Sequence, residues 1–366
     1  MSKFKVIQLL PELNIGGVER GTKDFSKVLV DRGHDSLVIS NGGIFEKEII
    51  VDGGKHINLP IHKKSLFSIR YASDLRDIYL AEKPDIVHVR SRMPAWINYF
   101  AYKKLSHKPL LISTFHGLYS TPLYSQVMSK VDHIIAISKT VKDYIQGTYK
   151  VPNEKITVIP RGCDPEIFNK NPVEESWIKK WYEEFPQTQD KIILTMPTRI
   201  SKWKGVDSFI DLVNLLDDDN YHALIVGPTA KSKKSYLKQL QNKISNYGIE
   251  DKITITGSRN DISNIYKISD FVFNLSIKPE PFGRTTIEAI SSGSKVIGWN
   301  HGGTKEILEE LYPDGLVELE NIEDLTEKVI NLTNMTNNMP KDNIFTSERM
   351  TNQTISLYQD LLAKRL

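Results

Sequence analysis

The 366-residue sequence lacks the features of several specialised classes of protein. It has a single cysteine, Cys163, so no internal disulfide can form, and no zinc-type spacing of Cys and His occurs. No apolar run reaches the ~18 residues of a membrane-spanning helix, and the apolar stretch after Met1 is too short for a signal peptide. The net charge of +3 is far below that of a basic nucleic-acid-binding domain. We therefore expect a cytoplasmic protein, either free or peripheral on the cytoplasmic membrane face, with no nucleic-acid partner.

The composition, with 40% apolar and 25% charged residues, is that of an ordinary globular protein, and the length favours two domains. Short β-branched runs alternate with helical patterning, which predicts an α/β fold with parallel sheets. The pattern occurs twice along the chain. The expected strands are 5–10, 36–40, 85–89, 109–114 and 133–137 in the first set, and 191–196, 222–226, 252–256, 270–275 and 295–298 in the second.

A connector with two prolines and a glycine, 158–168, separates the two sets of strands. We place the domain boundary there, with one domain over 1–168 and another over 169–344. The last segment, 345–366, is predicted to be a helix because its apolar residues lie near one face. Ligands of open α/β sheets bind outside the carboxyl ends of the strands, so the loops at those ends are the candidate sites.

A glycine turn follows the first expected strand. Gly16 and Gly17 stand just before a helix that runs to about Asp31, where backbone N–H groups and the helix N-terminus can hold a phosphate. The order G-G-x-x-x-G differs from the dinucleotide fingerprint G-x-G-x-x-G, and no acidic residue ends the second strand. These differences disfavour a hydride-transfer enzyme. The turn by itself is equally consistent with a phosphate contact and with a simple strand-to-helix turn.

A basic loop follows the first strand of the second set. Arg199 and Lys204 lie in it, with Gly205 directly behind. The planar fork of Arg and the point charge of Lys both suit phosphate oxygens. A single loop lysine is usually solvated, and Lys202 is of that kind. We favour a diphosphate role for Arg199 and Lys204 because the rest of the pattern agrees with it.

The most informative segment carries two carboxylates. Glu280 lies between two prolines, which hold the backbone out of the helical region, and Glu288 lies in the first turns of the following helix. The N–H groups of 283–285 open that helix and can face a phosphate or a sugar. Carboxylates suit polyhydroxylated ligands. The plainer interpretations are a solvated loop acid for Glu280 and a helix-dipole partner for Glu288.

The spacing Glu280-x7-Glu288, inside Pro-Glu-Pro-Phe-Gly-Arg-Thr, resembles the E-x7-E motif of the retaining glycosyltransferases of family 4. Four further segments resemble family motifs in the expected order: the glycine loop 16–20, the loop 114–117 with its histidine, the segment 161–164 and the basic pair 199–205. Two departures are mild. Cys163 stands where valine is common, and Thr304 stands where proline is common in a second glycine loop.

The resemblance implies a GT-B fold, in which two Rossmann-like domains face each other across a deep cleft and the last helix returns to the first domain. It implies a nucleotide-sugar donor, with UDP favoured on family frequency, and transfer of a hexose or N-acetylhexosamine with retention. It also implies catalysis without a metal or another cofactor, and no D-x-D motif is present. The implied catalytic residues are His116, Glu280, Arg199 and Lys204. The implied donor-binding residues are Gly16, Gly17, Arg199, Lys204, Gly227, Arg259, Asn260, Glu280, Phe282, Gly283, Arg284, Thr285 and Glu288.

The acceptor is less clearly indicated. Basic and apolar residues mix over 62–70 and 90–104, which suits an anionic bilayer or a phosphorylated glycolipid. For the helix expected over 94–104 taken alone, a core helix with a solvated basic end is the slightly favoured interpretation. We expect a glycan or glycolipid acceptor in lipopolysaccharide or cell-envelope polysaccharide synthesis. A soluble small acceptor, a nucleotide-sugar epimerase and a non-catalytic sugar-nucleotide-binding protein are the alternatives, and the sequence does not indicate an oligomeric state.

Overall fold

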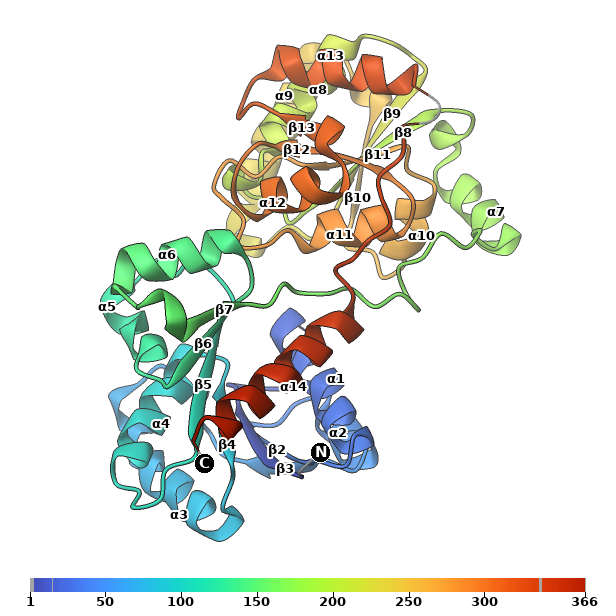
Figure 1. The fold of residues 1–366 in the computed structure, drawn as a ribbon. Coiled ribbons are helices and arrows are strands. Elements are labelled where there is room, and N and C mark those ends of the chain that lie inside the picture. The colour runs from blue at the N-terminus through green and yellow to red at the C-terminus, as the bar shows by residue number, and fades with distance from the viewer. Residues whose placement is uncertain (1–2, 15, 336–337, 366) are drawn as a thin grey trace. The chain divides into compact units, whose positions relative to one another are not determined.

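The computed structural model describes residues 3–14, 16–335 and 338–365 and divides the chain into two compact units. Unit 1 comprises Met1–Pro160 and Met350–Leu366, and unit 2 comprises Arg161–Arg349 (Figure 1). The division at Pro160 precedes the boundary placed at residue 168 from the sequence. The connector 158–168 therefore belongs mostly to unit 2, because Cys163 pairs with Thr346 of the same unit in an isolated parallel bridge.

Unit 1 contains a seven-stranded sheet in the order β3-β2-β1-β4-β5-β6-β7, and every pairing is parallel. The strands are β1 (Lys5–Leu9), β2 (Asp35–Ser40), β3 (Lys55–Asn58), β4 (Ile86–Val89), β5 (Leu110–Phe115), β6 (His133–Ala136) and β7 (Ile156–Val158). The α-helices are α1 (Gly17–Asp31), α2 (Glu46–Val51), α3 (Ala72–Glu82), α4 (Arg92–Lys103), α5 (Pro122–Ser125), α6 (Lys139–Tyr149) and α14 (Ser347–Ala363).

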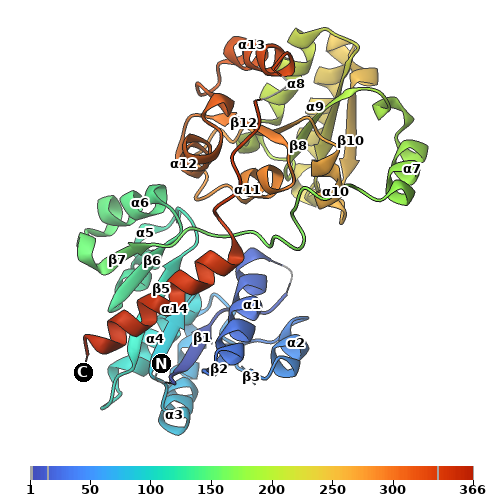
Figure 2. The same ribbon diagram turned by 45° about the vertical axis from the view of Figure 1, so that its right-hand side comes forward.

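Helix α14 reaches unit 1 from the far end of the sequence. It runs along the sheet of that unit beside α1, as the red helix among blue and cyan elements shows (Figures 1 and 2). Ile355 and Tyr358 pack there with Phe4, Phe25 and other apolar residues in one buried cluster. Burial of this apolar face is what holds the helix on unit 1, about 190 residues after that unit's last strand.

Unit 2 contains a six-stranded parallel sheet in the order β10-β9-β8-β11-β12-β13. The strands are β8 (Ile192–Pro197), β9 (Tyr221–Val226), β10 (Ile253–Gly257), β11 (Phe271–Asn274), β12 (Lys295–Trp299) and β13 (Leu316–Val317). The α-helices are α7 (Glu175–Glu184), α8 (Val206–Leu216), α9 (Lys234–Tyr247), α10 (Ile262–Lys267), α11 (Arg284–Ser291), α12 (Gly302–Leu311) and α13 (Ile322–Thr333).

The strand order defines where each unit holds its loops together. In unit 2 the chain leaves β8 toward β9 on one side and later places β11 on the other, so β8 and β11 flank the switch point. In unit 1 the corresponding pair is β1 and β4. Ligand sites of doubly wound sheets lie at such points. All ten expected strands are present, and the sequence analysis missed the short edge strands β3, β7 and β13.

Candidate active site

Two loops lie side by side at the switch point of unit 2, one after β8 and one after β11. Gly205, whose φ is +78°, permits this close approach because it has no Cβ atom. A Cβ atom there would lie 1.9 Å from the carbonyl oxygen of Leu275. The N–H of Ile277 donates to the carbonyl of Trp203 at 2.8 Å. The approach requires glycine, since any side chain would push the two loops apart.

Lys204 and Glu280 meet between these loops. The Nζ of Lys204 donates to Oε1 of Glu280, and the hydroxyl of Ser276 donates to the same oxygen at 2.7 Å. The exposed fractions of the two charged side chains are only 17% and 14%. The ammonium also lies 4.2 Å from the centroid of the Trp203 ring. Glu280 is therefore a partly buried, paired carboxylate rather than a solvated loop acid.

The first turn of α12 and its N-cap residue His301 support the loop that carries Glu280. The N–H of Gly303 donates to the carbonyl of Glu280 at 2.8 Å, and Nε2 of His301 donates to the carbonyl of Ser276 at 2.7 Å. A Cβ atom at Gly303 would lie 2.3 Å from the carbonyl oxygen of Phe282, so this contact also requires glycine. His301 is a positioning residue that the sequence analysis did not single out, although the adjacent glycine pair marked its loop.

Helix α11 presents the second carboxylate. Gly283 has a φ of +104° and caps the helix, which places Arg284 and Thr285 in its first turn. Glu288 is 7% exposed, and Nη2 of Arg284 donates to its Oε1 at 2.7 Å. Arg284 itself is about half exposed. The carboxylate is thus buried within its helix and neutralised by a cation that solvent or a ligand can reach.

Cys163 packs against the far end of the same helix. Its Sγ lies 3.1 Å from the hydroxyl of Ser291 and 3.1 Å from Nδ2 of Asn343. Burial raises the pKa of the thiol above its ordinary value, so Cys163 is neutral at physiological pH and acts as a small packing residue. The segment that resembles the R-G-V-D motif therefore helps to fix α11 and, through it, Glu288.

The remaining predicted donor residues of unit 2 have different surroundings. Arg199 is exposed just after β8, and Gly227 lies beneath its backbone, where a Cβ atom would lie 2.0 Å from the carbonyl oxygen of Thr198. Arg259 instead makes ion pairs at 2.8 Å with Asp261 and with Glu184. Hydrogen bonds to these two carboxylates, chiefly to Asp261, raise the pKa of Arg259. Arg259 therefore ties α7 to the loop before α10.

Asn260 is exposed beside Arg259 in that loop, and Phe282 is buried. The ring of Phe282 makes an edge contact with Phe345 at a centroid distance of 5.8 Å. Of the predicted unit 2 residues, the structure brings together Lys204, Glu280 and the start of α11, and it gives Arg259 partners of its own.

Gly16, Gly17 and His116 belong to unit 1. Gly16 caps α1 in an extended conformation and accepts from the N–H of Arg20 at 3.0 Å. A Cβ atom at Gly16 would lie 2.1 Å from a carboxylate oxygen of Glu19, which shows how closely that side chain folds over the turn. His116 is half-buried directly after β5. Both positions lie at the carboxyl edge of the sheet, as expected for contacts to a ligand.

A buried cluster of three polar side chains joins α14 to this edge of the unit 1 sheet. Nδ1 of His88 lies 2.5 Å from the hydroxyl of Tyr358, and Nε2 lies 2.6 Å from that of Thr114. Burial holds the pKa of His88 well below its ordinary range, so the ring is neutral at physiological pH. The sequence analysis missed this triad, because its members are separated by up to 270 residues.

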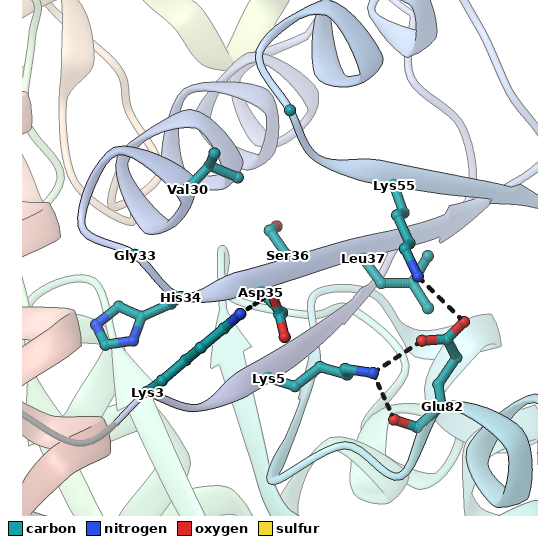
Figure 3. Close-up of a pocket in the computed structure, with 11 residues that line it drawn as sticks. Lys3, Lys5, Val30, Gly33, His34, Asp35, Ser36, Leu37, Lys55 and Glu82 are labelled. Carbon is teal, nitrogen blue, oxygen red and sulfur yellow. Dashed lines mark hydrogen bonds and ion pairs between the residues drawn. The ribbon is translucent and has the colours of Figure 1, made fainter.

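A cavity of about 310 Å³ opens at the opposite edge of the unit 1 sheet (Figure 3). It is lined by the amino ends of β1, β2 and β3, and its lysines are paired. Lys3 contacts Asp35 at 2.8 Å, and Lys5 and Lys55 contact Glu82 at 3.0 and 3.7 Å. Because the cations are neutralised and lie away from the carboxyl ends, this cavity is separate from the candidate active site.

Among residues 3–14, 16–335 and 338–365, no group of three or more His, Cys, Asp or Glu side chains could hold a metal ion. Within the same residues, no helix is long and apolar enough to cross a membrane.

Two Rossmann-like domains, with polar loops at the switch point of the second, define the GT-B class of glycosyltransferases. A family described as Glycosyltransferase Family 4 matches residues 15–167, and one described as Glycosyl transferases group 1 matches residues 178–347. A solved glycosyltransferase from Rickettsia africae is 30% identical, with each chain covered to 99% and a TM-score of 0.86. The chain therefore belongs to the family 4 glycosyltransferases, and it is a glycosyltransferase with the GT-B fold.

Three further comparisons are informative. Anabaena HepE, solved in complex with UDP and glucose, is 21% identical over 99% of this chain and 95% of its own, with a TM-score of 0.72. The N-acetyl-alpha-D-glucosaminyl L-malate synthase of Bacillus anthracis is 23% identical over 95% of both chains. One component of the human phosphatidylinositol N-acetylglucosaminyltransferase is 25% identical over 81% of this chain, which spans 62% of that human protein.

Proposed function

We propose that this protein is a retaining, metal-independent glycosyltransferase that moves a hexose or N-acetylhexosamine from a UDP-sugar to a glycan or glycolipid acceptor. The observation that carries the proposal is the pairing of Lys204 with Glu280 beside the start of α11. This pairing leaves a cation suited to phosphate, a carboxylate suited to sugar hydroxyls and a helix N-terminus at one switch point. The UDP and glucose named for HepE support the donor class.

The Lys204–Glu280 pair also suggests how the donor is received. Both side chains are mostly buried, so each charge depends on the other for stabilisation. The diphosphate of a bound donor offers Lys204 a stronger anionic partner. Exposed Arg199 adds a second cation from the same loop. In the proposed complex Lys204 turns to the diphosphate, while Glu280 accepts hydrogen bonds from the sugar hydroxyls and the N–H of Gly283 donates one to them.

Glu288 takes the ribose hydroxyls in this proposal. Its burial and its bond to Arg284 hold the carboxylate in one orientation, which suits bidentate acceptance from two vicinal hydroxyls. Gly227, Asn260 and Arg259 are proposed to border the base, with Arg259 acting through the loop that it ties to α7. From unit 1, Gly16 and Gly17 contribute N–H groups to the diphosphate.

The proposed reaction breaks the bond between the anomeric carbon and the diphosphate oxygen and forms one between that carbon and an acceptor hydroxyl. The acceptor attacks the face from which the diphosphate leaves, and a diphosphate oxygen takes the hydroxyl proton. The main electrostatic requirement is stabilisation of the departing diphosphate. Lys204, Arg199 and the N–H groups at the start of α11 provide this stabilisation. In this proposal His116 acts near the reacting centre, by its side chain or its carbonyl.

For the acceptor, the name of the human relative supports a lipid-linked substrate. A lipid-linked acceptor in turn favours a role on the cytoplasmic membrane face, in lipopolysaccharide or cell-envelope polysaccharide synthesis. The N-acetyl-alpha-D-glucosaminyl L-malate synthase of Bacillus anthracis favours a second candidate, a soluble hydroxy acid, because the match covers 95% of both chains.

A thermal-shift panel tests the donor first. UDP should raise the melting temperature of the protein, while GDP and ADP should not, because only a ligand bound to the folded state stabilises it. Lys204→Ala should weaken the shift, and Lys202→Ala, an exposed residue of the same turn, should leave it unchanged. No shift with any nucleoside diphosphate in a folded sample would contradict the proposal.

The reaction is then tested with the matching UDP-sugar. NMR of the product should show the anomeric configuration of the donor, and an inverted product would contradict retention. Turnover should persist in excess EDTA, and its loss would contradict metal independence.

A further inference from the structure

We propose that unit 1 docks on an anionic phospholipid bilayer through one surface patch, here called the lipid-facing patch, and that an apolar cavity in the patch receives part of an acyl chain. The patch comprises Lys63–Arg70 with the 3₁₀ turn Leu66–Tyr71, the outer face of α4, and α5. The inference rests on the proposed glycolipid acceptor and extends it, because an enzyme with such a substrate must work at a membrane surface.

The first observation is the set of apolar side chains that the patch exposes. Leu123, Leu66 and Phe67 are 88%, 85% and 84% exposed, and only Val51 among the described large apolar residues is comparably exposed, at 85%. Leu66 and Phe67 are consecutive, and Leu123 adjoins Tyr124 of the same cavity wall. Contiguous apolar exposure of this kind marks an interaction site rather than ordinary surface.

The exposed side chains stand on anchored backbone. The buried hydroxyl of Ser68 donates to the carbonyl of Lys63 at 2.9 Å and closes the turn that carries Leu66 and Phe67. Arg92 donates to the hydroxyl of Thr121 at 3.0 Å and lies over the Tyr124 ring, which fixes α5. The turn and the helix therefore hold their apolar side chains outward.

The second observation is the cavity between these elements. Its volume is about 380 Å³, within the usual ~300–1,000 Å³ of ligand pockets. It is lined mainly by Leu66, Ile69, Met93, Trp96, Phe100 and Tyr124. The indole N–H of Trp96 already donates to the carbonyl of Tyr124 at 2.9 Å. The indole therefore presents its apolar ring atoms, rather than a hydrogen-bond donor, to a ligand. Such a lining suits a hydrocarbon chain.

The third observation is the charge around the patch. Residues 61–73 and 91–131, which contain the patch and its borders, hold eight of the 48 Lys and Arg and none of the 45 Asp and Glu, so the rest of the chain has a net charge of −5. Lys63, Lys64, Lys103 and Lys104 are exposed at its borders. Lys103 and Lys130 lie over the Tyr99 ring at 4.7 and 5.1 Å. Cations that surround exposed apolar side chains complement an anionic bilayer.

Vesicle flotation with the full chain tests the proposal. The protein should float with vesicles of phosphatidylcholine mixed with phosphatidylglycerol and remain unbound with phosphatidylcholine alone. Leu66→Ser with Phe67→Ser should lower the bound fraction at least tenfold, since two large apolar side chains no longer enter the bilayer. Lys63→Glu with Lys64→Glu should lower it about tenfold, and added salt should have a similar effect. The matched control Val51→Ser should bind as the unchanged protein does.

Fluorescence tests the cavity. Trp96 is the only one of the five tryptophans outside Arg161–Arg349. Lipids with brominated acyl chains should quench part of the tryptophan emission, and Trp96→Phe should abolish that part. Flotation without this quenching would overturn the acyl-chain site.

Three results would overturn the membrane proposal. The first is that the protein does not float with the anionic vesicles. The second is that the Leu66→Ser and Phe67→Ser double variant floats as well as the unchanged protein. The third is that light scattering shows a dimer and that this double variant is a monomer. UDP binding measured on the same samples separates the two proposals. Lost flotation with intact UDP binding removes only the membrane inference, whereas lost UDP binding removes the proposed function.

Discussion

The two units share one architecture, but the candidate site of unit 2 and the lipid-facing patch of unit 1 treat their charged side chains in opposite ways. At the carboxyl edge of unit 2, Lys204 pairs with Glu280 and Arg284 pairs with Glu288, and the carboxylate of each pair is largely buried. On the lipid-facing patch of unit 1, cations such as Lys63 and Lys64 are exposed, in segments without a single acid. The charged groups of the unit 2 site are thus held by local partners, whereas the patch of unit 1 exposes its cations to solvent.

The difference indicates what kind of ligand each region suits. A nucleoside diphosphate is small and has a fixed structure, so a site for it gains affinity from groups that are held in place before binding. An acceptor or a membrane is large and variable, and long-range charge with exposed apolar area suits it better. The predictions below test whether unit 2 is preorganised as its contacts indicate.

The largest effect is expected at Lys204. Lys204→Ala should lower kcat by ~10²–10³-fold, because it removes a cation aimed at the charge that develops on the leaving group. Steady-state kinetics with the UDP-sugar measure this effect. Lys202→Ala should stay close to the unchanged enzyme. An equal loss in both variants would mean that general loop charge, rather than the Lys204 pairing, drives the reaction.

Gly205→Ala should be the most damaging change to the fold of unit 2. The new Cβ would press on the carbonyl of Leu275 at a φ of +78°, and the cost should be about 3 kcal/mol. Urea unfolding measures it. Gly248→Ala is the matched control, because its φ is +66° but nothing lies within 4 Å of a Cβ atom, and its cost should be about 1 kcal/mol. Equal costs would refute the close loop approach.

A smaller effect is expected for the buried carboxylate of α11. Glu288→Gln should weaken UDP binding by about tenfold to a hundredfold, since a charge-assisted hydrogen bond contributes roughly 1.5–3 kcal/mol. Titration calorimetry gives the affinity. Glu310→Gln, on the exposed side of α12, should bind UDP normally. Normal binding by Glu288→Gln would leave Glu288 as a helix-dipole partner.

Each unit also buries a neutral histidine, and this predicts how stability depends on pH. Burial, helped by the charge of Lys191, lowers the pKa of His222 in unit 2 to about 4, and burial holds that of His88 in unit 1 well below its ordinary range. The pKa of a histidine in the unfolded chain is ~6.5. Below that pH the histidines of the unfolded chain bind protons, whereas the buried histidines of the folded chain stay neutral. Stability should therefore be fully present above pH ~6.5 and fall as the pH is lowered.

For His222 the loss between pH 6.5 and pH 5 should be about 2 kcal/mol. Urea unfolding at several pH values measures it. His222→Gln removes this titration and should reduce the pH dependence of unit 2 while that of unit 1 persists. A free energy of unfolding that increases toward pH 5 would contradict the conclusion that the rings of His88 and His222 are buried as neutral groups.

The pattern of the sequence predicted much of this molecule because its signals are local. The β-branched runs marked ten of the thirteen strands, and the prolines on either side of Glu280 marked the loop that carries it. The short strands β3, β7 and β13 were missed, because two to four residues give too little periodicity to detect. The motif order led to the family, which the comparisons confirm.

The partners of the site residues could not be predicted in the same way. The resemblance to the family implied that Arg259 binds the donor, but nothing local showed that Glu184 and Asp261 hold its guanidinium. The role of His301 beneath Ser276 was likewise hidden, since a histidine beside a glycine pair can bond to many different groups.

The residues by themselves determined the class of fold, the two-domain organisation and the candidate site residues, because strand patterning, turn residues and motif spacing act over short stretches of chain. Tertiary structure alone decided that Lys204 meets Glu280, that Tyr358 of α14 closes over His88, and that Leu66 and Trp96 line one cavity. These contacts join residues 30 to 270 positions apart. Their geometry follows from how the sheets order their strands and bury their helices, which no local pattern specifies.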